Sequence, residues 1–158
     1  DTPDEDYRNP TYILHSLVDI VSKNGNYLID IGPTANGTVV SPSRTSLLKV
    51  GEWLRFAEEA IYDTQYWYVT AEEGDLRFTT KPDAFCIISL SYPTDGVLRS
   101  ISSLPLKDGD VATFLGPDQS QKELAWSWSS SGVIELLVDE EELAMVQDTW
   151  LFKITYTQ

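Results

Sequence analysis

The sequence predicts an α/β fragment followed by an all-β antiparallel sandwich, and two patterns carry this prediction. Residues 1–68 alternate between helical and strand-like apolar patterns. Residues 69–158 consist almost entirely of short strand-like runs that are separated by turn signals. A chain of 158 residues is long enough for one domain or two small ones, and we place the boundary between residues 68 and 69.

Residues 10–23 are predicted to form an amphipathic helix. Asn9 can cap this helix, and Pro10 fits the first helical position, where its missing N–H costs nothing. Asn24-Gly25 ends the helix, because both residues tolerate the left-handed conformation. Apolar residues recur at spacings of three and four along one face: Ile13, Leu14, Leu17, Val18 and Val21.

A strand and a second helix are predicted next. Residues 26–31 form a nearly continuous apolar run, which is typical of a strand that is buried on both faces of a parallel sheet. After a loop at residues 34–40, Ser41-Pro42 repeats the cap-plus-proline signal and predicts a helix over residues 42–57. A single buried strand would leave its backbone N–H and C=O groups unpaired. Its neighbouring strands must therefore come from elsewhere, as in a β/α repeat of which only the last unit remains.

Eight short strands are predicted in the second half, at the spacing that is typical of an antiparallel sandwich or barrel. The acidic run at residues 139–142 is predicted to be a solvated loop and not a calcium site, because four adjacent carboxylates cannot all face one calcium ion. The predicted strands cover residues 66–69, 76–80, 84–91, 96–100, 111–115, 124–128, 133–137 and 151–157.

Composition excludes several classes of function. The chain has 11 basic and 25 acidic residues, a net charge of −14, and no basic cluster, so nucleic-acid binding is not expected. No apolar run approaches the ~20 residues that cross a bilayer, so no membrane span is expected. Cys86, the single cysteine, lies in an apolar run and is predicted to be a buried small hydrophobe. Together with His15 it supplies too few ligands for a structural zinc site, and no metal or cofactor is predicted.

Residues 17–34, LVDIVSKNGNYLIDIGPT, carry the most specific pattern in the chain. This stretch resembles a signature of the α-L-fucosidases of glycoside hydrolase family 29. The family pattern has valine-serine, then glycine-asparagine, then leucine-leucine-asparagine-isoleucine-glycine-proline. The likeness continues through Gly37, Gly51 and residues 59–62 to Trp67, and beyond that point it rests on architecture and on short words such as residues 78–81.

The resemblance implies both a fold and an activity. Family members combine a TIM-like (β/α)8 catalytic barrel with a carboxy-terminal β-sandwich, so residues 1–68 would be the end of the barrel and residues 69–158 the sandwich. A barrel takes roughly 250 residues, so the upstream catalytic part of the same enzyme is the expected partner. The implied reaction is retaining hydrolysis of terminal α-L-fucose from fucosylated oligosaccharides or glycoconjugates by two carboxylates, in a secreted or lysosomal enzyme. In the family both carboxylates precede this motif, so no catalytic residue is assigned here and this chain alone is expected to be inactive.

The candidate site residues follow from the same resemblance. Asp30, Gly32 and Pro33 would lie at the carboxyl end of the last barrel strand, the end at which barrel active sites form. Asp30 replaces the usual asparagine of the family, so it is either a carboxylate in the pocket wall or a swap without a catalytic role. Asn36-Gly37-Thr38 is an N-glycosylation sequon in a predicted surface loop. At residues 57–58 this chain has alanine-glutamate where the family tends to have asparagine-glycine. Since the glycine that would end the helix is missing, the second helix is expected to run longer or end differently.

One alternative belongs to another class of function, a non-catalytic carbohydrate-binding or interaction module. Trp126 and Trp128 share one face of a predicted strand, and Trp150 lies close to the last strand. Exposed aromatic side chains of this kind can stack on sugar rings. Tryptophan more often fills cores and domain interfaces, so we favour packing roles for all three.

Overall fold

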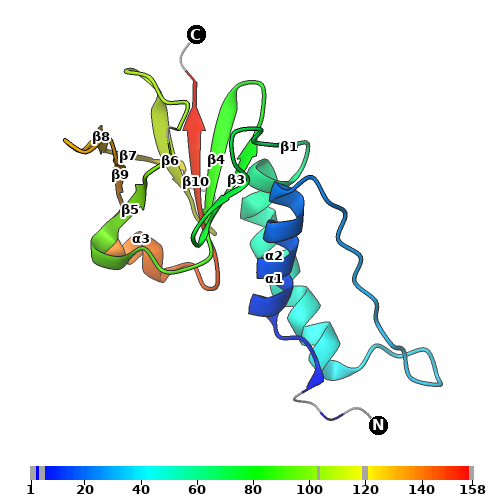
Figure 1. The fold of residues 1–158 in the computed structure, drawn as a ribbon. Helices are drawn as coiled ribbons and strands as arrows, with labels where there is room; N and C mark the ends of the chain where they lie inside the picture. The colour runs from blue at the N-terminus through cyan, green and yellow to red at the C-terminus, as the bar shows by residue number, and fades with distance from the viewer. Residues whose placement is uncertain (1–2, 4–5, 103, 119–120, 157–158) are drawn as a thin grey trace.

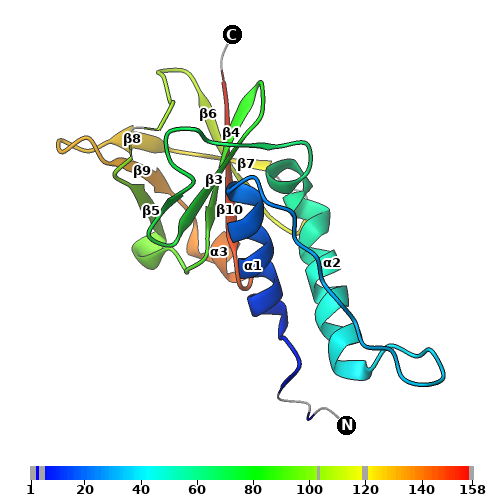
Figure 2. The same cartoon turned by 45° about the vertical axis from the view of Figure 1, so that its right-hand side comes forward.

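The computed structural model, which describes residues 3, 6–102, 104–118 and 121–156, has three layers (Figure 1). Two helices, α1 and α2, pack against one face of a seven-stranded sheet, and a three-stranded sheet covers its other face. Figure 2 shows the same arrangement from a second direction. The helices therefore pack directly on the sandwich.

Helix α1 covers Pro10–Ser22, close to the predicted bounds. The Asn9 side chain caps it by accepting a hydrogen bond from the backbone N–H of Tyr12, at 2.8 Å. Helix α2 covers Ser41–Ile61, and its N-cap is Val40, so the prediction of Ser41 as the cap was wrong by one residue. This helix continues past residue 57, as expected where no glycine ends it.

The predicted strand at residues 26–31 does not form. These residues belong to no strand, and Leu28 is 90% exposed, so the segment is not buried on both faces within the described chain. The physical reason is that the described part of the chain places no strand beside them. Figures 1 and 2 show the segment running back along the two helices, on the side away from the sheets.

All pairings in both sheets are antiparallel. The larger sheet has the order β1-β3-β4-β10-β6-β7, with β2 paired to β3 off this path, and the smaller one has the order β5-β9-β8. The larger sheet contains β1 Gln65–Tyr66, β2 Glu72–Glu73, β3 Leu76–Thr80, β4 Ala84–Ser89, β6 Val111–Leu115, β7 Gln121–Leu124 and β10 Trp150–Thr155. The smaller sheet contains β5 Val97–Ser100, β8 Trp126–Trp128 and β9 Ile134–Leu137, and the 3-10 turn η2 spans Thr94–Gly96.

The predicted strand 66–69 overlaps β1 only at Tyr66, and two further predictions in the second half need correction. The predicted strand 124–128 is two strands, because the chain leaves the larger sheet after β7 and enters the smaller one at β8. The acidic run is not a loop but the start of helix α3, Glu140–Ala144. The Asp139 side chain caps this helix through the N–H of Glu141, and carboxylates in a first turn are favoured by the helix dipole.

Strand β4 shows why the larger sheet is apolar on both faces. Phe85 and Ile87 point into the core between the two sheets, whereas Cys86 and Ile88 pack against the helices. Successive side chains of a strand point to opposite faces, so a strand covered on both sides is apolar at most positions. The neighbouring central strand β10 follows the same rule, with Phe152 between the sheets and Leu151 under the helices.

Glu73 ties the two sheets together. Its carboxylate accepts hydrogen bonds from the Ser100 hydroxyl at 2.9 Å and from the backbone N–H groups of Ile101 and Ser102, each at 2.7 Å. Partial burial raises the pKa of Glu73, but these hydrogen bonds favour the charged form and hold it below its ordinary value of 4.5.

Candidate functional site

Residues 26–33, between α1 and α2, form the candidate functional site, and we call them the inter-helix segment. Exposure alternates along it: Leu28 is 90% exposed, Ile29 and Ile31 are each 38% exposed, and Tyr27 is partly buried against the helical core. The period of two is that of an extended strand. By this period Leu28 and Asp30 lie on the outward face. On the other face Tyr27 packs against the helical core, while Ile29 and Ile31 stay exposed, though less so than Leu28.

The three predicted pocket residues lie at the end of this segment. Asp30, Gly32 and Pro33 are all exposed, and Pro33 forms an isolated antiparallel bridge with Val39. The Asp30 carboxylate has no hydrogen bond or ion pair with any residue that the structure describes. A β-carbon added at Gly32 would meet nothing within 4 Å. These residues therefore share a surface, but the described chain builds no enclosed pocket around them.

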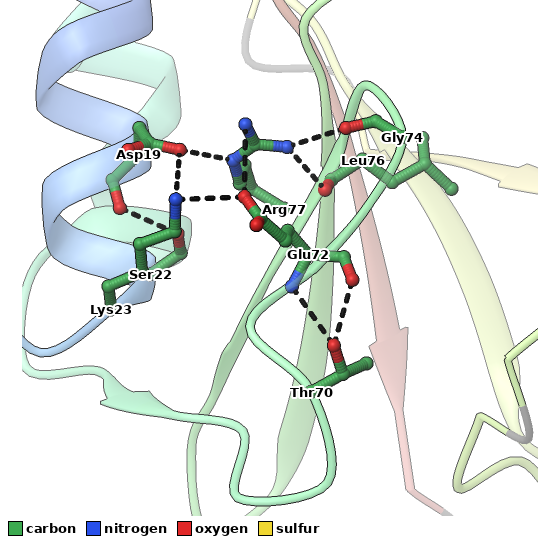
Figure 3. A network of polar contacts seen from close by, with 8 residues as sticks. All are labelled: Asp19, Ser22, Lys23, Thr70, Glu72, Gly74, Leu76 and Arg77. Atoms are coloured by element: carbon green, nitrogen blue, oxygen red, sulfur yellow. Dashed lines mark hydrogen bonds and ion pairs between the residues drawn. The ribbon is translucent and has the colours of Figure 1, made fainter.

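A polar network attaches α1 to the sandwich (Figure 3). The Nε of Arg77, on β3, lies 2.7 Å from the Asp19 carboxylate on α1, and its guanidinium lies 3.3 Å from the Glu72 carboxylate. Lys23 bridges the same two carboxylates at 2.8 Å each. Arg77 also donates to the backbone carbonyl oxygens of Gly74 and Leu76.

The charges of this network stabilise one another. Partial burial raises the pKa of Asp19, but hydrogen bonds from Lys23 and Arg77 outweigh this effect and leave the pKa below its ordinary value. Hydrogen bonds to Asp19 and Glu72 raise the pKa of Lys23. Arg77 was not predicted from the sequence. It is a charged residue between two core positions of strand β3, Leu76 and Phe78, and this pattern indicates that the other face of the strand meets a polar partner.

Further polar contacts join α2 to the sandwich. The Thr79 hydroxyl donates to the carbonyl oxygen of Ala60 at 2.8 Å, and the Trp53 indole N–H donates to that of Thr149 at 3.3 Å. Lys153 on β10 pairs with Glu59. Since hydrogen bonds are directional, these contacts hold the helices at one position on an otherwise apolar face.

The tryptophans of the sandwich do not form a flat surface. The rings of Trp126 and Trp128 are nearly perpendicular, with an interplanar angle of 85°, and the Trp126 N–H donates to the Asp110 carbonyl at 3.0 Å. Trp128 is 41% exposed. Trp150 is buried and donates to the carbonyl oxygen of Leu143, which agrees with the packing role predicted for it.

His15 and Cys86, the other side chains that could take part in a reaction, both lie in structural positions. The His15 ring lies 2.9 Å from the carbonyl oxygen of Asp148, so it links α1 to the loop before β10. Cys86 is buried as predicted, and burial raises the pKa of its thiol to about 11, which keeps it protonated. Within the described ranges, no group of three or more histidine, cysteine or acidic residues could hold a metal ion, and no helix is long and apolar enough to span a membrane.

Comparisons with known proteins identify the family. A sequence model of the α-L-fucosidase family matches residues 1–59, which include α1 and the inter-helix segment. The tissue α-L-fucosidase of Bos taurus is 39% identical over 127 residues, which cover 80% of this chain and 26% of that protein. This chain belongs to the α-L-fucosidase family.

Other family members extend the match over the sandwich. The tissue α-L-fucosidase of Rattus norvegicus is 33% identical over 147 residues, which cover 90% of this chain and 31% of that protein. The crystal structure of Thermotoga maritima α-fucosidase in complex with fucose has a TM-score of 0.83 and 28% identity, and the match covers 98% of this chain and 36% of that one. The chain thus spans about a third or less of the length of these relatives.

Proposed function

We propose that residues 1–158 are the carboxy-terminal part of a retaining α-L-fucosidase. In this proposal α1, the inter-helix segment and α2 are the last repeat of a TIM-like (β/α)8 barrel, and β1 to β10 belong to the accessory sandwich. The observation that carries the proposal is the inter-helix segment itself, which has the side-chain alternation of a strand and no strand beside it in the described chain.

The path of the chain supports this assignment. Helices α1 and α2 run in the same direction, and the inter-helix segment runs back along them on the side away from the sandwich (Figures 1 and 2). Successive helices of a β/α repeat have this parallel arrangement, and the strand between them runs the opposite way. In a closed barrel, the outward-facing Leu28 and Asp30 would point into the barrel interior.

The location of the substrate follows from the same geometry. Barrel active sites form at the carboxyl ends of the strands, which here is the end with Asp30, Gly32 and Pro33. The two catalytic carboxylates would come from a part of the enzyme outside residues 1–158, as the family resemblance implies. The substrate would be a terminal α-L-fucose on a glycan or glycoconjugate, and the compartment would be secretory or lysosomal. The crystal structure of the Thermotoga maritima enzyme is a complex with fucose, which supports this substrate class.

The test uses Ile29→Pro in the complete enzyme and in residues 1–158 alone. Proline removes a backbone N–H, which a strand in the middle of a barrel needs for pairing. In the described chain the Ile29 N–H has no partner. We expect Ile29→Pro to abolish hydrolysis of an aryl α-L-fucoside by the complete enzyme, and to leave the melting temperature of residues 1–158 unchanged.

Ala35→Pro is the matched control, because it lies at the second position of the turn from Thr34 to Gly37, a position that accepts proline. It should retain activity in the complete enzyme. Equal activity of the two proline variants would show that the inter-helix segment pairs with no strand. Fucose release by residues 1–158 alone would contradict the placement of the catalytic carboxylates.

A carbohydrate-binding module is the second candidate function, and the geometry favours it less. The perpendicular rings of Trp126 and Trp128 offer no shared plane on which a sugar could stack. Trp128→Ala in residues 1–158 should leave binding to a fucosylated glycan array unchanged. Loss of an array signal in that variant would favour this second function.

A further inference from the structure

The turn at residues 34–38 presents a sequon in an ordered conformation. Asn36 is the only asparagine of the chain with a permitted residue and then serine or threonine after it. The Gly37 N–H donates to the carbonyl oxygen of Thr34 at 2.8 Å, and Gly37 has a φ of +82°, which favours glycine. The Asn36 side-chain oxygen accepts hydrogen bonds from the Thr38 N–H, at 3.2 Å, and from the Thr34 hydroxyl.

This arrangement leaves the reactive nitrogen of Asn36 free. All hydrogen bonds of the side chain within the described residues go to its oxygen, and its amide nitrogen has no partner there. Residues 34–38 are all exposed. Figures 1 and 2 show the loop projecting past the start of α2, away from both sheets. A large substituent on this nitrogen would therefore meet solvent and not protein.

We propose that Asn36 carries an N-linked glycan that stands at the rim of the substrate-binding end of the barrel. The position at the rim rests on the proposed function, because the loop directly follows the carboxyl end of the inter-helix segment. The donor is a lipid-linked oligosaccharide diphosphate. The Asn36 nitrogen bonds to the anomeric carbon of the donor sugar and loses one proton, while the bond from that carbon to the phosphate oxygen breaks and the diphosphate leaves with the electron pair.

Such a glycan would narrow access from one side of the active site. A small aryl α-L-fucoside would pass it, whereas a fucosylated glycoprotein would have to approach around it. The eukaryotic relatives from Bos taurus and Rattus norvegicus make the secretory pathway of a eukaryotic cell the appropriate host for the test.

The experiment compares the complete enzyme with two substitutions at the third sequon position, both made in that host. Thr38→Ser keeps the sequon, whereas Thr38→Val removes it and leaves Asn36 and the size of the side chain in place. Trypsin releases residues 24–44 as one peptide, since Lys23 and Arg44 bound it. Enzymatic deglycosylation in water labelled with oxygen-18 marks occupied Asn36 and separates it from earlier spontaneous deamidation at Asn24-Gly25 and Asn36-Gly37. The same treatment of Thr38→Val measures the deamidation that occurs during the incubation.

We expect the labelled aspartate at position 36 in the parent enzyme and in Thr38→Ser, and its loss in Thr38→Val. We also expect Thr38→Val to raise kcat/KM several-fold on a fucosylated glycoprotein and to leave it unchanged on the aryl fucoside. An unlabelled Asn36 in the parent enzyme overturns the modification. A labelled Asn36 overturns the position at the rim if Thr38→Val leaves unchanged the ratio of kcat/KM on the glycoprotein to kcat/KM on the aryl fucoside. Failure of every form to hydrolyse the aryl fucoside would refute the proposed function, and the mass label would still report the modification.

Discussion

Replacing Arg77 tests how the helices are attached to the sandwich. The Arg77 side chain is 13% exposed and joins Asp19 on α1 to Glu72 on β2, while it also satisfies two backbone carbonyl groups. Arg77→Met keeps most of the apolar stem and removes every donor. A hydrogen bond to a charged group is worth about 1.5–3 kcal/mol, and solvent exposure of the carboxylates places the expected loss near the lower end, about 2 kcal/mol.

Lys23→Met is the matched control for this substitution. It removes the same charge from the same two carboxylates, but the Lys23 side chain is 41% exposed and its ammonium group remains in water. We therefore expect a much smaller loss of stability from Lys23→Met than from Arg77→Met. Because both variants change the net charge equally, a general charge effect cannot produce this difference.

Urea unfolding of residues 1–158, followed by the fluorescence of the buried tryptophans, measures both losses. For a domain of this size, 2 kcal/mol corresponds to a fall in Tm of about 4–8 °C. Adding Asp19→Asn to each variant completes a double-mutant cycle, and the Asp19–Arg77 pair should show a coupling energy of about 1 kcal/mol or more. Equal losses for Arg77→Met and Lys23→Met, or a coupling energy near zero, would refute the role of the network in attaching α1.

Three further predictions concern other parts of the chain. Because its pKa is lowered in the folded state, the Glu73 carboxylate stabilises the fold above pH 4.5 and loses this effect as the pH falls through the lower folded value. Glu73→Gln should lower the free energy of unfolding by about 1 kcal/mol at pH 7. Urea unfolding of the variant and the parent should give the same free energy in acid. Cys86 should not react with a disulfide reagent at pH 8 until the chain unfolds, and rapid reaction of the folded chain would contradict its burial. In residues 1–158, Phe152→Ala should lower the free energy of unfolding by about 3–5 kcal/mol, whereas Leu28→Ala should change it by no more than about 0.5 kcal/mol. Calorimetry measures both, and comparable losses for the two variants would show that the inter-helix segment is packed.

The strands of the sandwich could be predicted because their signals are local. Strand β3 begins and ends at the predicted residues, since turn residues bound it on both sides and its apolar positions alternate. Helix α1 was predictable for the same reason, from Asn9-Pro10 at one end and Asn24-Gly25 at the other. Such signals act within a few residues and do not depend on what the element packs against.

Features that depend on distant contacts could not be predicted in this way. The division of residues 124–128 between two sheets follows from which strand lies beside each half, not from any turn residue. The packing of α1 and α2 on the sandwich depends on the outer face of β4 and β10, and the apolar runs of these strands did not reveal which layer would cover them. The pocket assignment of Asp30, Gly32 and Pro33 came from the family resemblance, and it stays a prediction.

The distribution of polar contacts gives the sandwich a role in the proposed enzyme. The contacts between helices and sheet include a largely buried arginine, an ion pair at Lys153 and two side-chain hydrogen bonds to backbone carbonyls. The inter-helix segment, by contrast, makes a single backbone pairing with the described residues, the isolated bridge between Pro33 and Val39. The sandwich would thus fix the positions of α1 and α2, and these helices would present the segment for pairing. Loosening α1 by Arg77→Met should therefore misplace the segment and the Asp30 that it carries, and lower the activity of the complete enzyme. This effect is expected although Arg77 lies on the sheet side of α1 and the segment lies on the side away from the sheets.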